Sequence, residues 1–503
     1  MRTQDFGGLK RQTAIGLFWS LGQAWGVRLI TLLHYLVIAR FLEPSDLGLV
    51  AFAITIVACL GSLADFGITT WIESSPPQGA NTLDSAWWST VIIAALMAGA
   101  LVASAPALAN WSEKPQLTPV LRALALTPIF SAASAIQCSL LKTHFMHRVI
   151  AIASLFACTI GSLTAIVCVV AGLSYWSLVA KVVLEAALVS AVLAWCSPWR
   201  PSWHFDRRAW IEAVRHSLPI LGARVLEIAN QRLDSLVIGS QLGTNALGFY
   251  ATGQRLYQIT MEGLFSAVNQ VSLPLFARFA AEPARAATVL LRLIACTSLL
   301  SFPIFALMAT TAPDLITVFF GHKWQPAAPV LTVFCLGGVL NSVSYFNAPL
   351  LLASGHARLV FGLSLLNAIL NTAGFLWAVR FGITAVASAF VIRGFLVYPI
   401  NLILVRTVCG LSIRRYFQSL LPASMAGAIA SLAVWFWLDS NTTDLWAPSL
   451  RLFTGWALGI GVYLATIFLV FRAQAKTVLT EIEAMVRSTQ GTSPSSERAA
   501  PER

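Results

Sequence analysis

The feature that most constrains this chain is a succession of apolar runs, each about 20 residues long, from near Ile15 to near Phe471. An α-helix of that length spans the hydrocarbon core of a bilayer, which is roughly 30 Å thick. The runs are continuous, whereas the strands of a membrane β-barrel would alternate apolar and polar residues. Only 11% of the residues are charged, against about a quarter in soluble domains, so we predict an all-α polytopic membrane protein.

The runs predict about 14 transmembrane helices. Most breaks between them carry Pro, Gly, Asp or Ser, which favour turns. The predicted spans are 15–39, 46–66, 86–105, 118–138, 149–171, 175–196, 216–240, 246–270, 288–310, 328–353, 358–379, 383–405, 418–438 and 450–471.

The formal net charge of +12 invites a nucleic-acid interpretation, but the basic residues are scattered through short loops. With the N-terminus inside, 21 of the 33 Lys and Arg residues fall in segments predicted to be inside and 6 in segments predicted to be outside. The positive-inside rule explains this distribution. We therefore expect no nucleic-acid partner, and both termini in the cytoplasm of a bacterial inner membrane.

A weak internal repeat relates two distant segments at an offset of 200 residues. Residues 37–51 (VIARFLEPSDLGLVA) align without gaps to residues 237–251 (VIGSQLGTNALGFYA). The first and seventh predicted helices have the same orientation, so the repeat is parallel, with its axis along the membrane normal. The predicted parts are an N-terminal lobe of six helices (1–197), a cytoplasmic linker (198–215), a C-terminal lobe of six helices (216–406), two further helices (407–471) and a largely disordered tail (472–503).

The sequence gives little support for a metal site or a catalytic site. The eight Cys and seven His residues are scattered, without paired Cys spacing or an HxxxH pattern beside a carboxylate. No segment outside the membrane is long enough to fold as a catalytic domain. We expect no metal site, no catalytic residue and no cofactor, and we predict a transporter rather than an enzyme.

Charges inside the predicted spans are the candidate functional groups. Each basic side chain near the bilayer centre costs roughly 2.5–3.5 kcal/mol, so each needs a partner or a function. Guanidinium groups in excess over nearby acids suit a phosphate, which Arg binds in a bidentate manner. We predict that Arg28, Arg224, Arg255 and Arg232 bind substrate in a cleft between the lobes. Lys181 and Arg393 lie close enough to span ends to snorkel instead.

Four carboxylates are candidates for coupling transport to a proton or sodium gradient. They are Asp65, Glu227, Asp234 and Glu262. The spacing of Arg224, Glu227, Gln231 and Asp234 places these four within about 80° of one helix face.

A simpler interpretation of the same charges stays open, namely internal salt bridges that lock helices together. Three pairs have spacings suited to such local contacts. They are Arg224 with Glu227, Arg232 with Asp234, and Lys181 with Glu185.

Several stretches resemble the polysaccharide transporter family, which includes Wzx-type and colanic-acid-type flippases of lipid-linked oligosaccharides. They are RFLEPSDLGLVAFA, LADFGITTWI, QRLDSLVIGSQLGTNALGFYATGQRL, GHKWQPAAPVL and LLLASGHARL, and the resemblance covers roughly residues 15–420. It implies two lobes around a cationic cavity. In the related lipid II flippases, Arg residues on helices 1 and 8 line that cavity, and Arg28 and Arg255 lie on those helices here.

The resemblance also implies an activity. It points to alternating-access transfer of undecaprenyl-pyrophosphate-linked repeat units of O-antigen, exopolysaccharide or capsule to the periplasmic leaflet. The partners it implies are that substrate, membrane lipids, and polysaccharide polymerase and chain-length proteins. A multidrug or organic-cation antiporter of the same superfamily is the first alternative, and a membrane glycan polymerase or ligase is the second.

Overall fold

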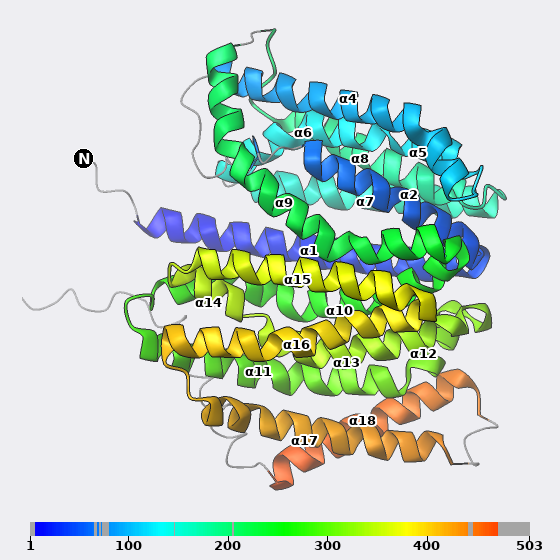
Figure 1. The fold of residues 1–503 in the computed structure, drawn as a ribbon, viewed down its shortest axis with the longest axis vertical. Helices are drawn as coiled ribbons and strands as arrows, with labels where there is room; N and C mark the ends of the chain where they lie inside the picture. The colour runs from blue at the N-terminus through cyan, green and yellow to red at the C-terminus, as the bar shows by residue number, and fades with distance from the viewer. Residues whose placement is uncertain are drawn as a thin grey trace, which may run out of the picture. The chain divides into compact units, whose positions relative to one another are not determined.

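The computed structural model describes residues 6–64, 68–69, 72, 80–144, 146–203, 206–440 and 446–470, and every regular element in these ranges is a helix. Figure 1 labels these helices along the chain. They are α1 (Phe6–Phe41), α2 (Pro44–Ala64), α4 (Ala80–Trp111), α5 (Leu117–Leu124), α6 (Leu126–Thr143), α7 (His147–Val170), α8 (Trp176–Cys196), α9 (Arg207–Gln241), α10 (Gly243–Ala277), α11 (Pro283–Thr310), α12 (Ala312–Phe320), η1 (His322–Ala327), α13 (Ala328–Ser344), α14 (Asn347–Ala353), α15 (Ala357–Ala378), η2 (Val379–Phe381), α16 (Ile383–Cys409), α17 (Ile413–Leu438) and α18 (Pro448–Val470).

The all-α prediction is confirmed, and helices occupy the predicted spans. Two of those spans are divided: 118–138 falls on α5 and α6, and 328–353 on α13 and α14. Among the described residues, 12 helical segments are long and apolar enough to cross a membrane. Helices α9 and α10 are not in that set; α9 carries several charged residues, and α10 carries Arg255 and Glu262 among many polar residues and glycines. The number of 14 crossings stays a prediction.

Contacts within the chain define two compact units. The first comprises Met1–Val271, Ile316–Gly337 and His356–Tyr398, and the second comprises Ser272–Leu315, Gly338–Gly355 and Pro399–Arg503. Their bounds differ from those of the predicted lobes, which stay a prediction. Residues 207–215 of the predicted linker form the first turns of α9, and the predicted tail lies outside the described residues.

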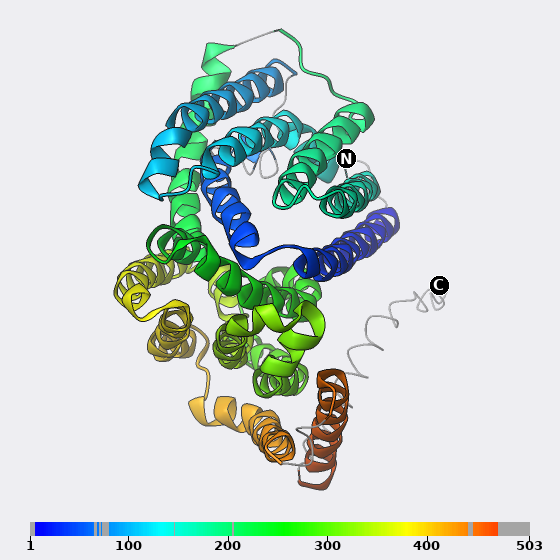
Figure 2. The ribbon, with the colours of Figure 1, turned by 90° about the vertical axis from the view of Figure 1, so that its right-hand side faces the viewer.

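In the first unit, α1 packs against α7, α7 against α8, and α2 against α9. Figure 2 views these helices from a direction close to their axes. Small residues allow close approach, as is usual between membrane helices. A Cβ added at Gly26 on α1 would lie 2.6 Å from Leu155 on α7, and one at Gly161 on α7 would lie 3.3 Å from the backbone oxygen of Lys181 on α8.

In the second unit, α11 packs against α17, and α17 against α18. Glycines again lie at the contacts, because a Cβ added at Gly459 on α18 would lie 3.0 Å from Val434 on α17. The hydroxyl of Tyr463 on α18 donates a hydrogen bond of 2.7 Å to the backbone oxygen of Leu299 on α11. The three helices therefore form a closely packed group.

Large apolar side chains are exposed on helices of both units. Phe18 is 72% exposed, Trp195 84% and Phe453 73%. A soluble protein rarely exposes many such residues together, whereas a surface in contact with lipid chains does. The exposed faces are therefore those of a membrane protein.

Candidate anion-binding cavities

The first unit contains a cavity with a volume of about 550 Å³, to which α1, α7, α8 and α10 contribute residues. We call it the α1 cavity. Its lining consists of Ser20, Gln23, Ala24, Val27, Arg28, Thr31, Ser154, Glu185, Val189, Arg255 and Glu262. Two of the four predicted substrate-binding arginines, Arg28 and Arg255, therefore share one cavity.

The arginines of the α1 cavity differ in their partners. The Nε of Arg28 donates to Oε2 of Glu262 at 3.0 Å, which joins α1 to α10. The Nη1 of Arg28 is enclosed and has no hydrogen-bond partner within the described part of the chain. Arg255 is half-buried, and no described carboxylate lies within ion-pair distance of it. The cavity therefore retains guanidinium N–H groups that can bind an anion.

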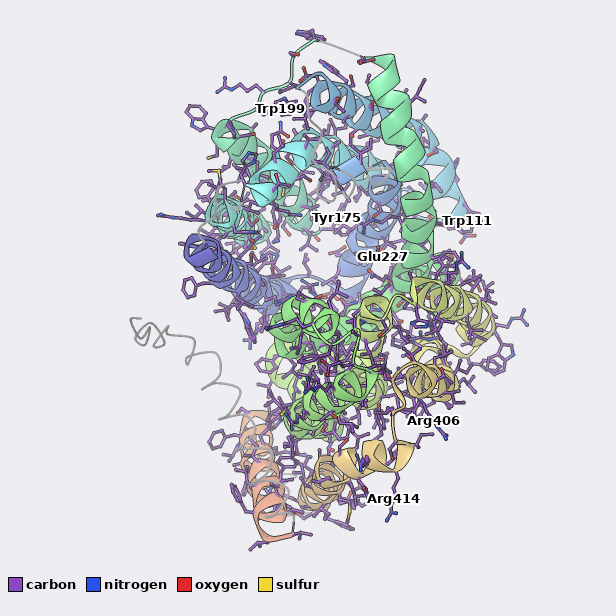
Figure 3. The ribbon with its side chains drawn as sticks, turned by 90° about the vertical axis from the view of Figure 1, so that its left-hand side faces the viewer. Trp111, Tyr175, Trp199, Glu227, Arg406 and Arg414 are labelled. Atoms are coloured by element: carbon purple, nitrogen blue, oxygen red, sulfur yellow. The ribbon has the colours of Figure 1, made fainter. Side chains whose placement is uncertain are left out.

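A second polar cavity lies between α2 and α9, and we call it the α9 cavity. Its volume is about 100 Å³. Its lining consists of Ala58, Ser62, Arg224, Glu227, Ile228, Gln231 and Arg232. Figure 3 shows Glu227 on α9, next to α2. A larger and mainly apolar cavity of about 400 Å³ shares Ala58, Ser62 and Arg224 with it.

The α9 cavity contains one ion pair and one further arginine. Nη1 of Arg224 lies 2.9 Å from Oε2 of Glu227, whose Oε1 accepts a hydrogen bond of 3.2 Å from Gln231. Arg232 is exposed to the cavity and has no ion-pair partner among the described residues. Of the three local pairs considered from spacing, Arg224 with Glu227 is confirmed.

The 200-residue repeat relates the two cavities. Four of the six lining positions on α1, increased by 200, give lining positions on α9. The equivalent positions are Ala24 and Arg224, Val27 and Glu227, Arg28 and Ile228, and Thr31 and Gln231; Glu262 on α10 corresponds to Ser62 on α2. The cavities thus occupy the same place in the two copies, and Arg224 lies one helical turn from the position equivalent to Arg28.

Each cavity carries an excess of positive charge. In the α9 cavity, two arginines face one glutamate. In the α1 cavity, Arg28 and Arg255 face Glu262 and Glu185, but Glu185 already pairs with Lys181 at 2.8 Å. The α9 cavity therefore has an excess of one positive charge, and so does the α1 cavity once Lys181 is counted with its partner Glu185, which favours an anionic ligand.

Asp234 does not belong to either cavity. Its side chain is 4% exposed and accepts hydrogen bonds of 2.7 Å from the hydroxyl of Tyr250 and from Nε2 of Gln254, both on α10. The local pairing of Asp234 with Arg232 is therefore wrong. Asp234 lies at the edge of the predicted polar face, where packing turns it toward α10 and away from Glu227 and Gln231.

The remaining predicted charges have separate environments. Lys181 is 9% exposed and pairs with Glu185, which confirms that local pair. Arg393 donates to Oδ1 of Asn367 and lies over the ring of Phe390, 4.6 Å from its centroid. Neither side chain snorkels, because both find partners inside the unit. Asp65 lies outside the described residues.

A close contact joins the two copies of the repeat at the other end of these helices. A Cβ added at Gly48, in the second turn of α2, would overlap the backbone oxygen of Thr244 in the first turn of α10. A Cβ added at Gly248 would overlap the backbone oxygen of Pro44 in the same way. Positions 44 and 48 are equivalent to 244 and 248, so the contact is symmetric about a local twofold axis.

Nearby side chains extend this contact. The indole Nε1 of Trp324 in η1 donates a hydrogen bond of 2.8 Å to the backbone oxygen of Ala39 near the end of α1. Ala39 lies about 17 Å along α1 from Arg28, at 1.5 Å per residue. One end of the two repeat hairpins is therefore closed, while the polar cavities lie several turns away.

Sequence reasoning assigned Glu185 only as a partner of Lys181 and missed Gln23 and Ser154. Gln23 donates a hydrogen bond of 2.9 Å to Ser154 across the α1–α7 contact in the cavity wall. A glutamine within an apolar run was the available signal, because a buried amide requires a hydrogen-bond partner. The partner on α7 could not be identified from local spacing.

The fold and the cavities together define a helical membrane protein with charged internal cavities. The fold is similar to that of the lipid II flippase MurJ in its inward closed conformation, with a TM-score of 0.75, 15% identity, and coverage of 91% of this chain and 99% of that chain. A multidrug resistance MATE family transporter in its inward-facing conformation aligns with a TM-score of 0.54 and 14% identity, over 78% of this chain and 94% of that chain.

The chain belongs to the family described as polysaccharide biosynthesis protein, whose model matches residues 37–329. It is 25% identical to the succinoglycan biosynthesis transport protein ExoT of Rhizobium meliloti, over 92% of this chain and 94% of the relative. It is 23% identical to the lipopolysaccharide biosynthesis protein WzxC of Escherichia coli, over 82% and 85% of the two chains. The resemblance seen in the sequence is confirmed, and the chain is a multi-pass bacterial membrane transporter of this family.

Proposed function

We propose that the protein is a flippase that moves undecaprenyl-pyrophosphate-linked oligosaccharide repeat units from the cytoplasmic to the periplasmic leaflet of the inner membrane. The repeat units would belong to an exopolysaccharide, O-antigen or capsule. The observation that carries the proposal is the pair of repeat-related cavities, each with one arginine that forms no ion pair among the described residues. The transport and biosynthesis names of the relatives support it.

The pyrophosphate is the group that the cavities bind. Arg255 and the free Nη1 of Arg28 supply N–H donors in the α1 cavity, and Arg224 and Arg232 supply them in the α9 cavity. Charge-assisted bonds between guanidinium and phosphate are short and strong. Glu262 holds Arg28 in the absence of ligand and exchanges with the incoming phosphate. The glycan occupies the polar part of the cleft, and the prenyl chain stays in lipid.

Transport proceeds by alternating access. By the positive-inside rule, both termini would lie in the cytoplasm, and the contact of Gly48 with Gly248 and their neighbours would then close the periplasmic side. Release requires the two hairpins to separate there. An inside-negative potential of 100 mV would contribute about 4.6 kcal/mol to the outward movement of a dianion, at roughly 2.3 kcal/mol per charge.

Coupling to a proton or sodium gradient is part of the proposal, and no cofactor is needed. Glu227 and Glu262 are suited to it, because each pairs with an arginine that an anion would engage. Polysaccharide polymerase and chain-length proteins would act after release of the repeat unit. An organic-cation antiporter is disfavoured because both cavities carry an excess of positive charge.

The test is complementation of a deletion strain. Arg28→Ala, Arg255→Ala and Arg224→Ala should each reduce surface polysaccharide at least tenfold and cause lipid-linked repeat units to accumulate in the inner leaflet, because the anion loses a donor group. Arg285→Ala is the matched control, since Arg285 forms an ion pair of 2.8 Å with Glu282 outside the cavities. Normal polysaccharide in all three cavity variants would refute the proposal.

A further inference from the structure

A line of hydrogen-bonding side chains follows the contact between α1 and α7, starting in the α1 cavity. Ser20 lies 3.4 Å from Nδ1 of His147. Gln23 donates to Ser154 at 2.9 Å, and Thr31 lies 3.7 Å from the sulfur of Cys158. Ser20, Gln23, Thr31 and Ser154 also line the cavity, so these pairs border it along the contact between α1 and α7.

The line leads to a buried imidazole. His34 follows Thr31 by about one helical turn on α1 and is 4% exposed. Within the described residues, neither of its ring nitrogens has a hydrogen-bond partner, and neither does the hydroxyl of Ser162 on α7, which is 4% exposed. Buried polar groups are almost always satisfied, so unsatisfied atoms that lie together indicate a bound water or a protonation site.

The imidazole has a charged neighbour that is linked to the cavity. The ammonium of Lys181 on α8 acts electrostatically on the ring, and the backbone of Ser162 lies beside it. Lys181 pairs with Glu185 at 2.8 Å, and Glu185 lines the α1 cavity. A change of charge in the cavity can therefore reach His34 through one ion pair.

We propose that His34, with Ser162 and the Lys181–Glu185 pair, forms a proton-binding site whose occupancy is linked to anion binding in the α1 cavity. This inference rests on the proposed function, because it requires an anionic headgroup in that cavity. A proton from cavity water bonds to the unprotonated ring nitrogen and gives an imidazolium, while the hydroxide passes to the buffer. No electron is transferred and no bond between heavy atoms changes.

The sign of the linkage follows from the surrounding charges. The groups that face His34 or its neighbours are Cys158 and Ser162 on α7, Lys181 and Glu185 on α8, and Arg255 on α10, which acts on the adjacent Tyr35. An anion that engages Arg28 and Arg255 adds negative charge beside Glu185 and favours the imidazolium. Proton uptake and anion binding therefore strengthen each other.

The experiment measures proton uptake on binding of farnesyl diphosphate, used as the diphosphate-lipid probe. Full-length protein in lipid nanodiscs is titrated calorimetrically at pH 7 in HEPES and in Tris, whose different ionisation heats reveal the number of protons exchanged. We expect the wild type to take up as much as about one proton per ligand more than His34→Gln. Binding should strengthen about 5- to 150-fold between pH 8 and pH 5 in the wild type relative to that variant.

Controls separate this role from a structural one. Titration of the probe itself is common to all variants and cancels in the difference. His34→Asn is used instead if the His34→Gln variant does not fold. His356 is exposed, so His356→Gln should behave as wild type. Equal proton uptake in wild type and His34→Gln overturns the inference and leaves the proposed function intact. Lower thermal stability with unchanged uptake would assign the site to a structural water and overturn it too. Absence of probe binding to the wild type would refute the anion site, and with it this linkage.

Discussion

The contact around Gly48 and Gly248 gives a sharp prediction about alternating access. In Gly48→Ala the new methyl would overlap the backbone oxygen of Thr244, which cannot rotate away as a side chain can. Helices α2 and α10 would have to separate by about 1–2 Å to restore ordinary contact distances. The closed arrangement should therefore lose stability relative to one in which the hairpins are apart.

The magnitude follows from overpacking. Extra methyl groups in a close contact cost about 1–3 kcal/mol. The gain in helix propensity from Gly to Ala, up to about 1 kcal/mol, applies equally to both arrangements and cancels. The ratio of separated to closed hairpins should thus rise about 5- to 150-fold, at 1.4 kcal/mol per factor of ten. Gly248→Ala should act in the same direction, because its contact with Pro44 is equivalent.

Thiol accessibility provides the assay. In a variant whose native cysteines are replaced, Gln23→Cys places one thiol in the wall of the α1 cavity. A membrane-impermeant maleimide applied from the periplasmic side should label it at least fivefold faster in Gly48→Ala and in Gly248→Ala. The double variant should fall short of the sum of the two effects, because separation caused by one methyl relieves the other.

The repeat supplies matched controls for this experiment. Gly22 on α1 and Gly222 on α9 are also 200 residues apart, and nothing lies within 4 Å of a Cβ added at either. Their Ala variants gain the same helix propensity without a clash, so labelling should stay at the wild-type rate. Unchanged labelling in both Gly48→Ala and Gly248→Ala, or an equal increase in Gly22→Ala, would refute the reasoning.

Three further predictions concern side chains in the first unit. Glu262→Gln removes the ion pair to Arg28, so affinity for farnesyl diphosphate should rise several-fold in a binding titration, and weaker binding would contradict the exchange of carboxylate for phosphate. Asp234→Asn should lower the free energy of unfolding by about 1–3 kcal/mol, because the new amide group donates where Tyr250 or Gln254 also donates, and a hydrogen bond is lost. Thermal unfolding in detergent measures this, and an unchanged Tm would show that the network is dispensable. Trp324→Phe should cost about 0.5–1.5 kcal/mol for the lost hydrogen bond and Trp324→Ala about 3–5 kcal/mol, and the reverse order of Tm would argue against its buried position.

Much of the fold could be predicted because lipid demands long apolar helices. Helices α9 and α10 were predicted from their apolar runs, although polar residues lower the hydropathy of both. The breaks between α5 and α6 and between α13 and α14 could not be predicted, because the apolar pattern continues through them. Domain bounds depend on contacts between distant helices, which hydropathy does not encode.

The candidate site was predictable to the extent that buried charge is costly. Arg28 and Arg255 could be singled out because an apolar helix has no other reason to carry them. Pairs within one helix follow from spacing, as Arg224 with Glu227 illustrates. The bond from Arg28 to Glu262 joins residues 234 positions apart, and only tertiary packing brings them together.

In the structure, the carboxylate of Glu262 occupies the place beside Arg28 that an anionic ligand would take. An anionic ligand can displace this carboxylate, and the guanidinium of Arg28 then keeps a negatively charged partner. A neutral lipid of the same size would provide no such charge. Under the proposed function, the cavity would therefore discriminate against uncharged membrane lipids before any sugar is recognised. The displaced carboxylate of Glu262 would then lie unpaired in the cavity wall on α10, so its ion pairing would differ between the empty and the occupied cavity.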